Sequence, residues 1–166
     1  MTNAIPGSRR GRVLRTATAL GTVTLGLLAL SACEKPTPLA TVTVGGETVT
    51  AEAACYEDGK TIGEAEAKKC ADAKAEKKIT VGHGDKIRIG VEPEMAEEGW
   101  MLFVNDQSVL PEPTDKTYYS FPGDAFFQKQ GPTGQAEPTK DAEISIVMTK
   151  DGNFKGAWHI EAKQEK

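Results

Sequence analysis

The chain of 166 residues lacks the motifs that usually mark catalytic or cofactor-binding proteins. It has no His-Glu-x-x-His, phosphate-loop or calcium-loop pattern. The His-x-Glu at residues 159–161 is not followed by the Pro-Cys-x-x-Cys of nucleobase deaminases. Only three serines follow residue 32 (Ser108, Ser120 and Ser145), and none lies in Gly-x-Ser-x-Gly or Ser-x-x-Lys. We therefore predict a protein that is not an enzyme and carries no cofactor; paired carboxylates need no motif, so an envelope hydrolase stays a distant alternative.

The segment that precedes Cys33 lacks acids and lacks an apolar run long enough to span a membrane. Four arginines between residues 9 and 15 precede an uncharged run from Thr16 to Ala32, and the first acid is Glu34. The apolar part, residues 17–30, is shorter than the roughly 20 residues of a spanning helix. A basic start, a short apolar core and small residues at the end are typical of an export signal. We predict a cleaved signal peptide over residues 1–32; a retained membrane anchor is the alternative.

The four residues Leu30-Ser31-Ala32-Cys33 match the bacterial lipobox, Leu-[Ala/Ser]-[Gly/Ala]-Cys. In proteins with this motif the cysteine sulfur receives a diacylglyceryl group, and cleavage makes that cysteine the new N-terminus. We predict a lipoprotein attached through acyl chains, such as palmitate, on Cys33 to the extracellular face of the cell membrane. A soluble secreted protein is the alternative. The export route is open, because Ser8-Arg9-Arg10 begins a twin-arginine motif that Arg12 then breaks.

The predicted mature chain has an excess of acidic residues. All 24 acids but only 16 of the 20 basic residues follow residue 32, so its net charge is −8 against −4 for the whole chain. Such a domain is a poor candidate for binding nucleic acid. Residues 33–166 are enough for one domain with a hydrophobic core.

Cysteine is scarce, and its count fits an oxidising compartment. With Cys33 lipidated, Cys55 and Cys70 remain as a pair, which we predict forms a disulfide. A metal pair or two free thiols are the alternatives. Two cysteines at this spacing with no nearby histidine do not make a zinc site.

The pattern after residue 38 is mostly that of short β-strands. Residues 39–53 alternate Thr and Val around Gly45-Gly46, which predicts a hairpin, and Lys150-Asp151-Gly152 predicts a second one. Thr61 and Glu64 fit a helix capping box, which predicts a short surface helix reaching about Lys78.

The remaining segments give the other expected elements. Strands are expected at 79–81, 86–92, 100–106 (the central strand) and 116–121, whereas acidic residues 92–99 and polar residues 128–141 are expected to be loops. We predict an immunoglobulin-like β-sandwich over residues 39–166, with residues 33–38 as the lipidated N-terminus and a stiff tether.

Half of the ten aromatic residues lie in one stretch of the chain. Packing in the core is the default expectation for them, with Trp100 and Trp158 as further core residues. The functional alternative is an aromatic ridge that binds a cell-envelope protein or a glycan. The five residues of this possible ridge are Tyr118, Tyr119, Phe121, Phe126 and Phe127.

The two histidines are expected to be ordinary turn or surface residues. His83 lies between two glycines, and His159 alternates with Trp158 and Ile160, so it should face away from the core. The stretch "ITVGHGDKIRIGV" resembles the strand-turn-strand opening of cupredoxins. A blue-copper site would also need a cysteine near Met148 and His159, and none is present. No metal site is predicted.

Two longer segments, "LSACEKPTPLATVTVGGETVTAEAACYEDGK" and "GWMLFVNDQ", resemble a family of small actinobacterial lipoproteins with no assigned function. The resemblance implies a membrane-anchored extracellular domain and supplies no catalytic residues. We therefore expect a non-enzymatic binding or interaction module of the cell envelope. The alternative is a cupredoxin-like carrier of a small molecule or metal, without a blue-copper site.

Overall fold

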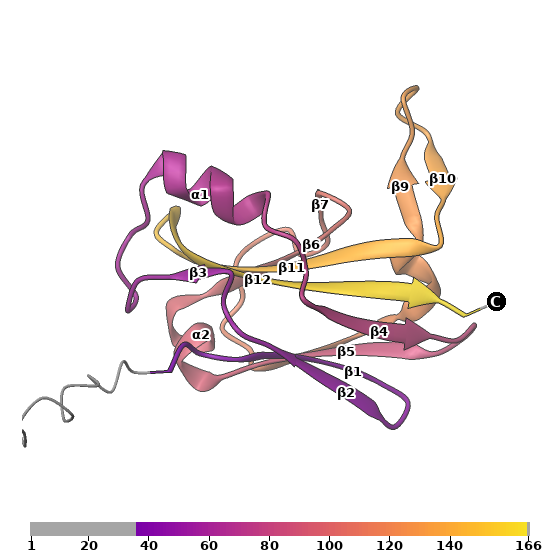
Figure 1. Ribbon diagram of the computed structural model, residues 1–166, viewed down its shortest axis with the longest axis horizontal. Helices are drawn as coiled ribbons and strands as arrows, with labels where there is room; N and C mark the ends of the chain where they lie inside the picture. The colour runs from indigo at the N-terminus through magenta and orange to yellow at the C-terminus, as the bar shows by residue number, and fades with distance from the viewer. Residues whose placement is uncertain (1–35, 166) are drawn as a thin grey trace, which may run out of the picture. The chain divides into compact units, whose positions relative to one another are not determined.

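The computed structural model describes residues 36–165, which form a β-sandwich of two sheets (Figure 1). The signal peptide and the lipobox with Cys33, both predicted from the sequence, lie outside the described residues. The smaller sheet has four antiparallel strands, in the order β2 (Glu47–Ala51), β1 (Ala40–Val44), β5 (Lys86–Val91), β8 (Tyr118–Pro122).

The larger sheet is built around the hairpin of β11 and β12. Its strands, in order, are β3 (Cys55–Tyr56), β12 (Asn153–Gln164), β11 (Asp141–Lys150), β6 (Trp100–Val104) and β7 (Gln107–Ser108). A sixth strand, β4 (Lys77–Val81), runs parallel to β12 beyond β3. The predicted β-sandwich is confirmed, as are both predicted hairpins.

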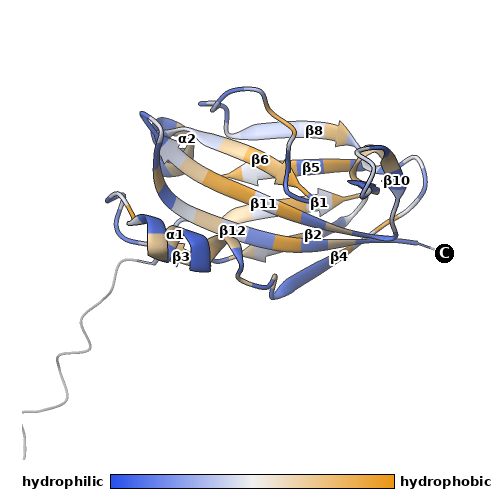
Figure 2. Cartoon of the chain, turned by 90° about the horizontal axis from the view of Figure 1, so that it is seen from above, coloured by the Kyte–Doolittle hydropathy of each residue, from blue (hydrophilic) through white to orange (hydrophobic). Residues whose placement is uncertain are grey.

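The core lies between the two sheets because each strand turns alternate side chains inward. The residues that are fully buried include Val42, Ile87 and Ile89 from the small sheet and Leu102, Ile144, Ile146, Trp158 and Ile160 from the large one. Figure 2 shows the hydrophobic segments that run along β6, β11 and β12. Trp100 and Trp158 are both core residues, as predicted.

The strands flanking the Gly-His-Gly-Asp turn do not pair with each other, because they belong to different sheets. β4 joins β12, whereas β5 lies between β1 and β8. The turn at residues 82–85 therefore carries the chain from the large sheet to the small one at one end of the sandwich (Figure 1).

Four local predictions were wrong. The helix α1 spans Glu64–Ala71 and not a segment reaching Lys78, because residues 77–81 pair with β12. Its N-cap is Gly63 with no side-chain hydrogen bond, so Thr61 and Glu64 make no capping box. The acidic segment expected as a loop forms helix α2 (Pro93–Glu98), since Met95 and Ala96 are buried against the core.

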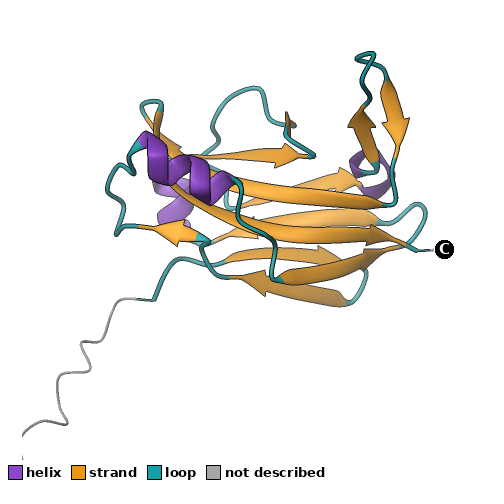
Figure 3. Ribbon diagram, turned by 45° about the horizontal axis from the view of Figure 1, so that its top comes forward, coloured by secondary structure: helices purple, strands orange, loops and turns teal. Residues whose placement is uncertain are grey.

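The fourth correction concerns residues 128–141, which were expected to be a polar loop. They contain a hairpin of β9 (Gln128–Gln130) and β10 (Ala136–Pro138) that follows the 3₁₀ helix η1 (Gly123–Phe126). Every residue of both strands is exposed, so the polarity of the segment carried no sign of the pairing. The hairpin projects from the end of the sandwich where the chain terminates (Figure 3).

The start of the domain is fixed by Trp158. Pro38, which the sequence assigned to the tether, is buried, and its carbonyl oxygen accepts a buried hydrogen bond of 2.7 Å from the Trp158 indole Nε1. The chain therefore joins the sandwich at Pro38, one residue before the predicted domain boundary.

We expect Trp158→Phe to lower the free energy of unfolding by about 2–4 kcal/mol, because it leaves a cavity in the core and a buried Pro38 carbonyl without a donor. Urea unfolding measures this. Tyr118→Phe is the control; the residue is 53% exposed, so we expect a change within about 0.5 kcal/mol. Equal effects of the two substitutions would contradict this role of Trp158.

Candidate functional site

The predicted disulfide between Cys55 and Cys70 is present and fastens helix α1 to the large sheet. Cys55 lies in β3, which pairs with β12, and Cys70 is the one residue of α1 that is buried. The other side chains of this helix are polar or small, so it has little apolar surface to hold it in place. The covalent bond compensates for this weak packing.

His159 is covered by α1, which corrects the expectation of a surface histidine. Its side chain does face away from the core, as predicted, but the residue is only 5% exposed. Nε2 lies 2.9 Å from the Cys70 carbonyl oxygen. Because a carbonyl only accepts hydrogen bonds, Nε2 carries the ring proton and donates it to α1.

The second ring nitrogen of His159 is occupied as well. In the neutral ring Nδ1 is an acceptor, and the Ser145 hydroxyl, 2.9 Å away, donates to it. A Glu143 carboxylate oxygen also lies 3.7 Å from Nδ1. A serine that donates to an oriented histidine is the first requirement for nucleophilic catalysis. Here the ring side chain is 3% exposed and both nitrogens are satisfied, so the arrangement serves to hold α1 on the sheet.

The five aromatics of the proposed ridge do not lie on one surface. Phe126 and Phe127 are buried. Tyr119 and Phe121 are half-buried and stack on each other at 5.7 Å, and Tyr118 alone is exposed. The stack continues to Trp100 on one side and to Phe126 on the other, so most of these rings close the gap between β6 and β8.

A second polar contact joins strand β3 to helix α2. The Tyr56 hydroxyl donates a 2.7 Å hydrogen bond to a Glu94 carboxylate oxygen. Burial, and then this hydrogen bond to a carboxylate, raise the pKa of Tyr56 far above its ordinary value. The phenol therefore stays protonated and keeps donating to α2, which makes this contact structural.

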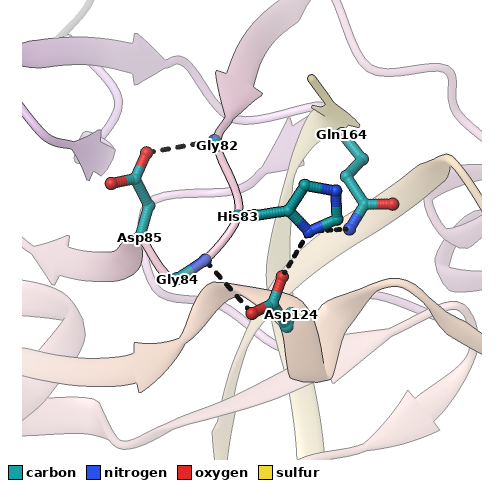
Figure 4. Close-up of polar contacts among 6 residues, drawn as sticks. All are labelled: Gly82, His83, Gly84, Asp85, Asp124 and Gln164. Atoms are coloured by element: carbon teal, nitrogen blue, oxygen red, sulfur yellow. Dashed lines mark hydrogen bonds and ion pairs between the residues drawn. The ribbon is translucent and has the colours of Figure 1, made fainter. Parts of the chain in front are cut away.

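Polar side chains from three segments converge at the turn between β4 and β5 (Figure 4). The turn itself is held by two aspartates. Asp85 accepts a 3.0 Å hydrogen bond from the Gly82 amide, and Asp124, from η1, accepts one of 3.2 Å from the Gly84 amide. Gly84 has a φ of +78°, a conformation that glycine adopts readily.

The turn presents the ring of His83 between Asp124 and Gln164. His83 Nδ1 lies 3.4 Å from Asp124 Oδ1 and 3.5 Å from the side-chain amide of Gln164, which comes from the end of β12. The His83 side chain is 74% exposed, and no described residue forms a hydrogen bond or ion pair with its Nε2. Of the two histidines, His83 is therefore the one that solvent or a ligand can reach.

A cavity of about 640 Å³ lies beside this cluster and is open to solvent. It is lined by His83, Asp124, Phe127, Gln128, Ala136, Pro138 and Gln164. We call these residues the distal pocket. Imidazole, carboxylate and amide groups line one side of it, and Phe127, Ala136 and Pro138 supply apolar surface, a combination typical of ligand sites.

A second cavity, of about 470 Å³, lies where the ends of β2 and β4 meet. Its lining includes Leu39, Thr50, Glu52, Lys74 and the edge of His159. Both ring nitrogens of His159 are already bonded, so this cavity offers no free imidazole. The distal pocket is the better candidate site.

The sequence did not predict the distal pocket. The Gly-His-Gly-Asp turn is visible in the sequence, but Asp124 lies among the aromatic residues 118–127 and Gln164 carries no signal. These residues meet because β4 pairs in parallel with β12 and places Val81 opposite Gln164. A parallel pairing between strands that lie so far apart in the chain has no local sequence signature.

Comparison of the chain with protein-family models, with curated proteins and with solved structures finds no match. Within residues 36–165, no helix is long and apolar enough to cross a membrane. The same residues contain no group of three His, Cys, Asp or Glu side chains that could hold a metal ion.

We expect the double substitution Cys55→Ala, Cys70→Ala to lower the free energy of unfolding by about 3 kcal/mol, the value for a closed loop of this length. We also expect faster amide exchange in α1 and a shifted NMR signal of His159, because the helix supplies the Cys70 carbonyl. Ser145→Ala keeps the disulfide and should cost only about 1 kcal/mol. An unchanged His159 signal in the double variant would contradict this coupling.

Proposed function

We propose that the protein is a lipid-anchored binding module of the cell envelope that presents its distal pocket away from the membrane. One observation supports the geometry: the chain enters the sandwich at one end and the candidate pocket lies at the other. Trp158 holds Pro38, and Gln164, six residues further along the same strand, lines the pocket. A strand of six residues spans about 20 Å.

The tether in this proposal is short. Pro38 follows Cys33 by five residues, which reach at most about 18 Å when fully extended. Because Pro38 is fixed in the core by Trp158, the end of the domain that carries it stays near the headgroups. The opposite end, with the distal pocket and the β9–β10 hairpin, then points away from them (Figure 1).

Charge at this end gives the folded domain no attraction to the membrane. Glu92, Glu97 and Glu98 lie in or beside α2, at the end of the sandwich where the chain enters. Anionic headgroups repel such a surface. The acyl chains on Cys33 would supply the attraction, so binding to the membrane would not depend on the folded domain.

This proposal narrows the aromatic-ridge hypothesis. Phe126 and Phe127 are core residues, so a partner that binds the ridge would contact Tyr118 and the exposed parts of Tyr119 and Phe121. These residues lie on β8, a strand that pairs only with β5 among the described strands. The distal pocket gathers side chains from more segments and surrounds a cavity, so it is the stronger site.

We expect Cys33→Ser to abolish lipid attachment and signal cleavage at this position. Detergent phase partitioning should move the protein from the detergent phase to the aqueous phase, and intact-mass measurement should show an unprocessed, unacylated chain. Cys55→Ala is the matched control; it removes a different cysteine and should leave acylation unchanged. Normal acylation of the Cys33→Ser variant would refute the anchor.

A tagging experiment tests the orientation. A short peptide tag inserted between Pro132 and Thr133, at the tip of the β9–β10 hairpin, should react with a membrane-impermeant reagent on intact cells. The same tag between Asp151 and Gly152, at the opposite end of β12, should react more slowly on cells and equally well after detergent release. A tag in the hairpin that reacts only after lysis would refute the proposed orientation.

A further inference from the structure

We propose that His83, Asp124 and Gln164 form a binding site for a divalent transition-metal ion, with Zn²⁺ as the ion whose coordination they fit. This inference deepens the proposed function, because it names a ligand class for the distal pocket. It starts from the three side chains drawn around the turn in Figure 4.

The contacts of His83 Nδ1 are long for hydrogen bonds and close to the spacing of two metal ligands. The distances from His83 Nδ1 to Asp124 Oδ1 and to the Gln164 amide are 3.4 Å and 3.5 Å. Good hydrogen bonds between such atoms are about 2.7–3.2 Å long. Two ligands of a tetrahedral ion with bonds of 2.0–2.1 Å lie about 3.3–3.4 Å apart. An ion between His83 and Asp124 would fit their separation, and the 3.5 Å contact, which joins Nδ1 to the amide nitrogen of Gln164, places that side chain within reach.

The chemistry of the three donors suits zinc. Imidazole nitrogen and carboxylate oxygen are common zinc ligands, and a side-chain amide can supply a third, oxygen donor after a rotation that exchanges its oxygen and nitrogen. An ion at this position would replace the Nδ1 proton and attract the amide oxygen, so binding would favour the rotated amide. With three protein ligands and an open position, water would complete the coordination.

Negative charge around the turn also favours a cation. Asp85 and Glu165 both approach Gly82, since a Cβ atom placed there would lie 2.9 Å from Asp85 Oδ2 and 3.2 Å from Glu165 Oε2. Among residues 36–165, no lysine or arginine forms an ion pair with Asp85, Asp124 or Glu165. Asp85 and Glu165 are thus left without a lysine or arginine partner, and the one basic group near Asp124 is the His83 ring itself.

The backbone holds the site before any ion binds. The Gly84 amide orients Asp124, and the Gly123 amide donates a 2.7 Å hydrogen bond to the Asp85 carbonyl, which ties η1 to the turn. Gln164 is fixed by the pairing of β12 with β4, and the amide of Glu165 donates to the Val81 carbonyl. Little reorganisation would then be needed for binding.

The chain contains its own internal control, because it has only two histidines. The test is a titration of the purified protein, prepared without a polyhistidine tag, with Zn²⁺ while the ring signals of both histidines are followed by NMR. We expect the His83 signals to shift and saturate, with ligation at Nδ1 visible in long-range ¹H–¹⁵N spectra. The His159 signals should not move, because both nitrogens of that ring are engaged.

Variants then distinguish a zinc site formed by three side chains from binding to the exposed imidazole of His83 alone. His83→Ala should abolish the calorimetric response, and Asp124→Asn and Gln164→Ala should each weaken zinc affinity, the former by about tenfold or more. Glu143→Gln is the matched control, since it removes the acid that approaches the other histidine. In the His83, Asp124 and Gln164 variants, an unchanged His159 signal shows that the fold is intact. Glu143→Gln is excepted, because Glu143 lies beside His159.

Three results would overturn the inference. They are the absence of a response to millimolar Zn²⁺, binding that survives His83→Ala, and binding that needs His83 but is indifferent to both Asp124→Asn and Gln164→Ala. Each of these leaves the anchor and the orientation untouched, because those are measured by phase partitioning and surface labelling. Conversely, loss of membrane attachment without loss of zinc binding would refute only the proposed function.

Discussion

The pairing of β11 with β12 is the constraint on which the rest of the structure depends. The two strands stay in register from Asp141 opposite Lys163 to Lys150 opposite Asn153, with one irregularity after Met148. β6 extends this hairpin on one side, and β3 and β4 share its other side. One face of β12 supplies Trp158 and Ile160 to the core, and the opposite face supplies His159 to hold α1.

The same strand links the two ends of the domain. Trp158 fixes the entry of the chain at Pro38, and Gln164 reaches the turn that carries His83. The turn lies at this end because β4 runs parallel to β12 in the large sheet. The chain then crosses at the end of β12 into β5 of the small sheet. A sandwich whose sheets are joined in this way brings distant segments together at one edge, as the pocket around residues 83, 124 and 164 shows.

The sequence predicted those features that depend on local patterns. Alternation of apolar and polar residues identified most strands, Gly45-Gly46 identified a hairpin, and the scarcity of cysteine identified the disulfide. Where local preference and tertiary pairing disagreed, the prediction was wrong. Residues 72–78 favour helix by composition, yet Lys77 and Lys78 pair with β12 as part of strand β4. The acidic segment at residues 92–99 was expected to be solvated throughout, yet Met95 is buried, so one side of the segment packs against the core.

The candidate site was less predictable than the fold, because it depends on contacts between segments and on which of those contacts are already satisfied. Each histidine has an acid two residues further along the chain, and both were expected to be ordinary exposed residues. In the structure, His159 uses both nitrogens to join β11 and α1, and a bound ion would have to break that arrangement. His83 instead lies between two groups at distances too long for strong hydrogen bonds, and its side chain is 74% exposed. A histidine that is exposed and makes only long contacts is open to a ligand, and this difference makes the distal pocket, and not the enclosed serine–histidine pair, the place where we propose binding.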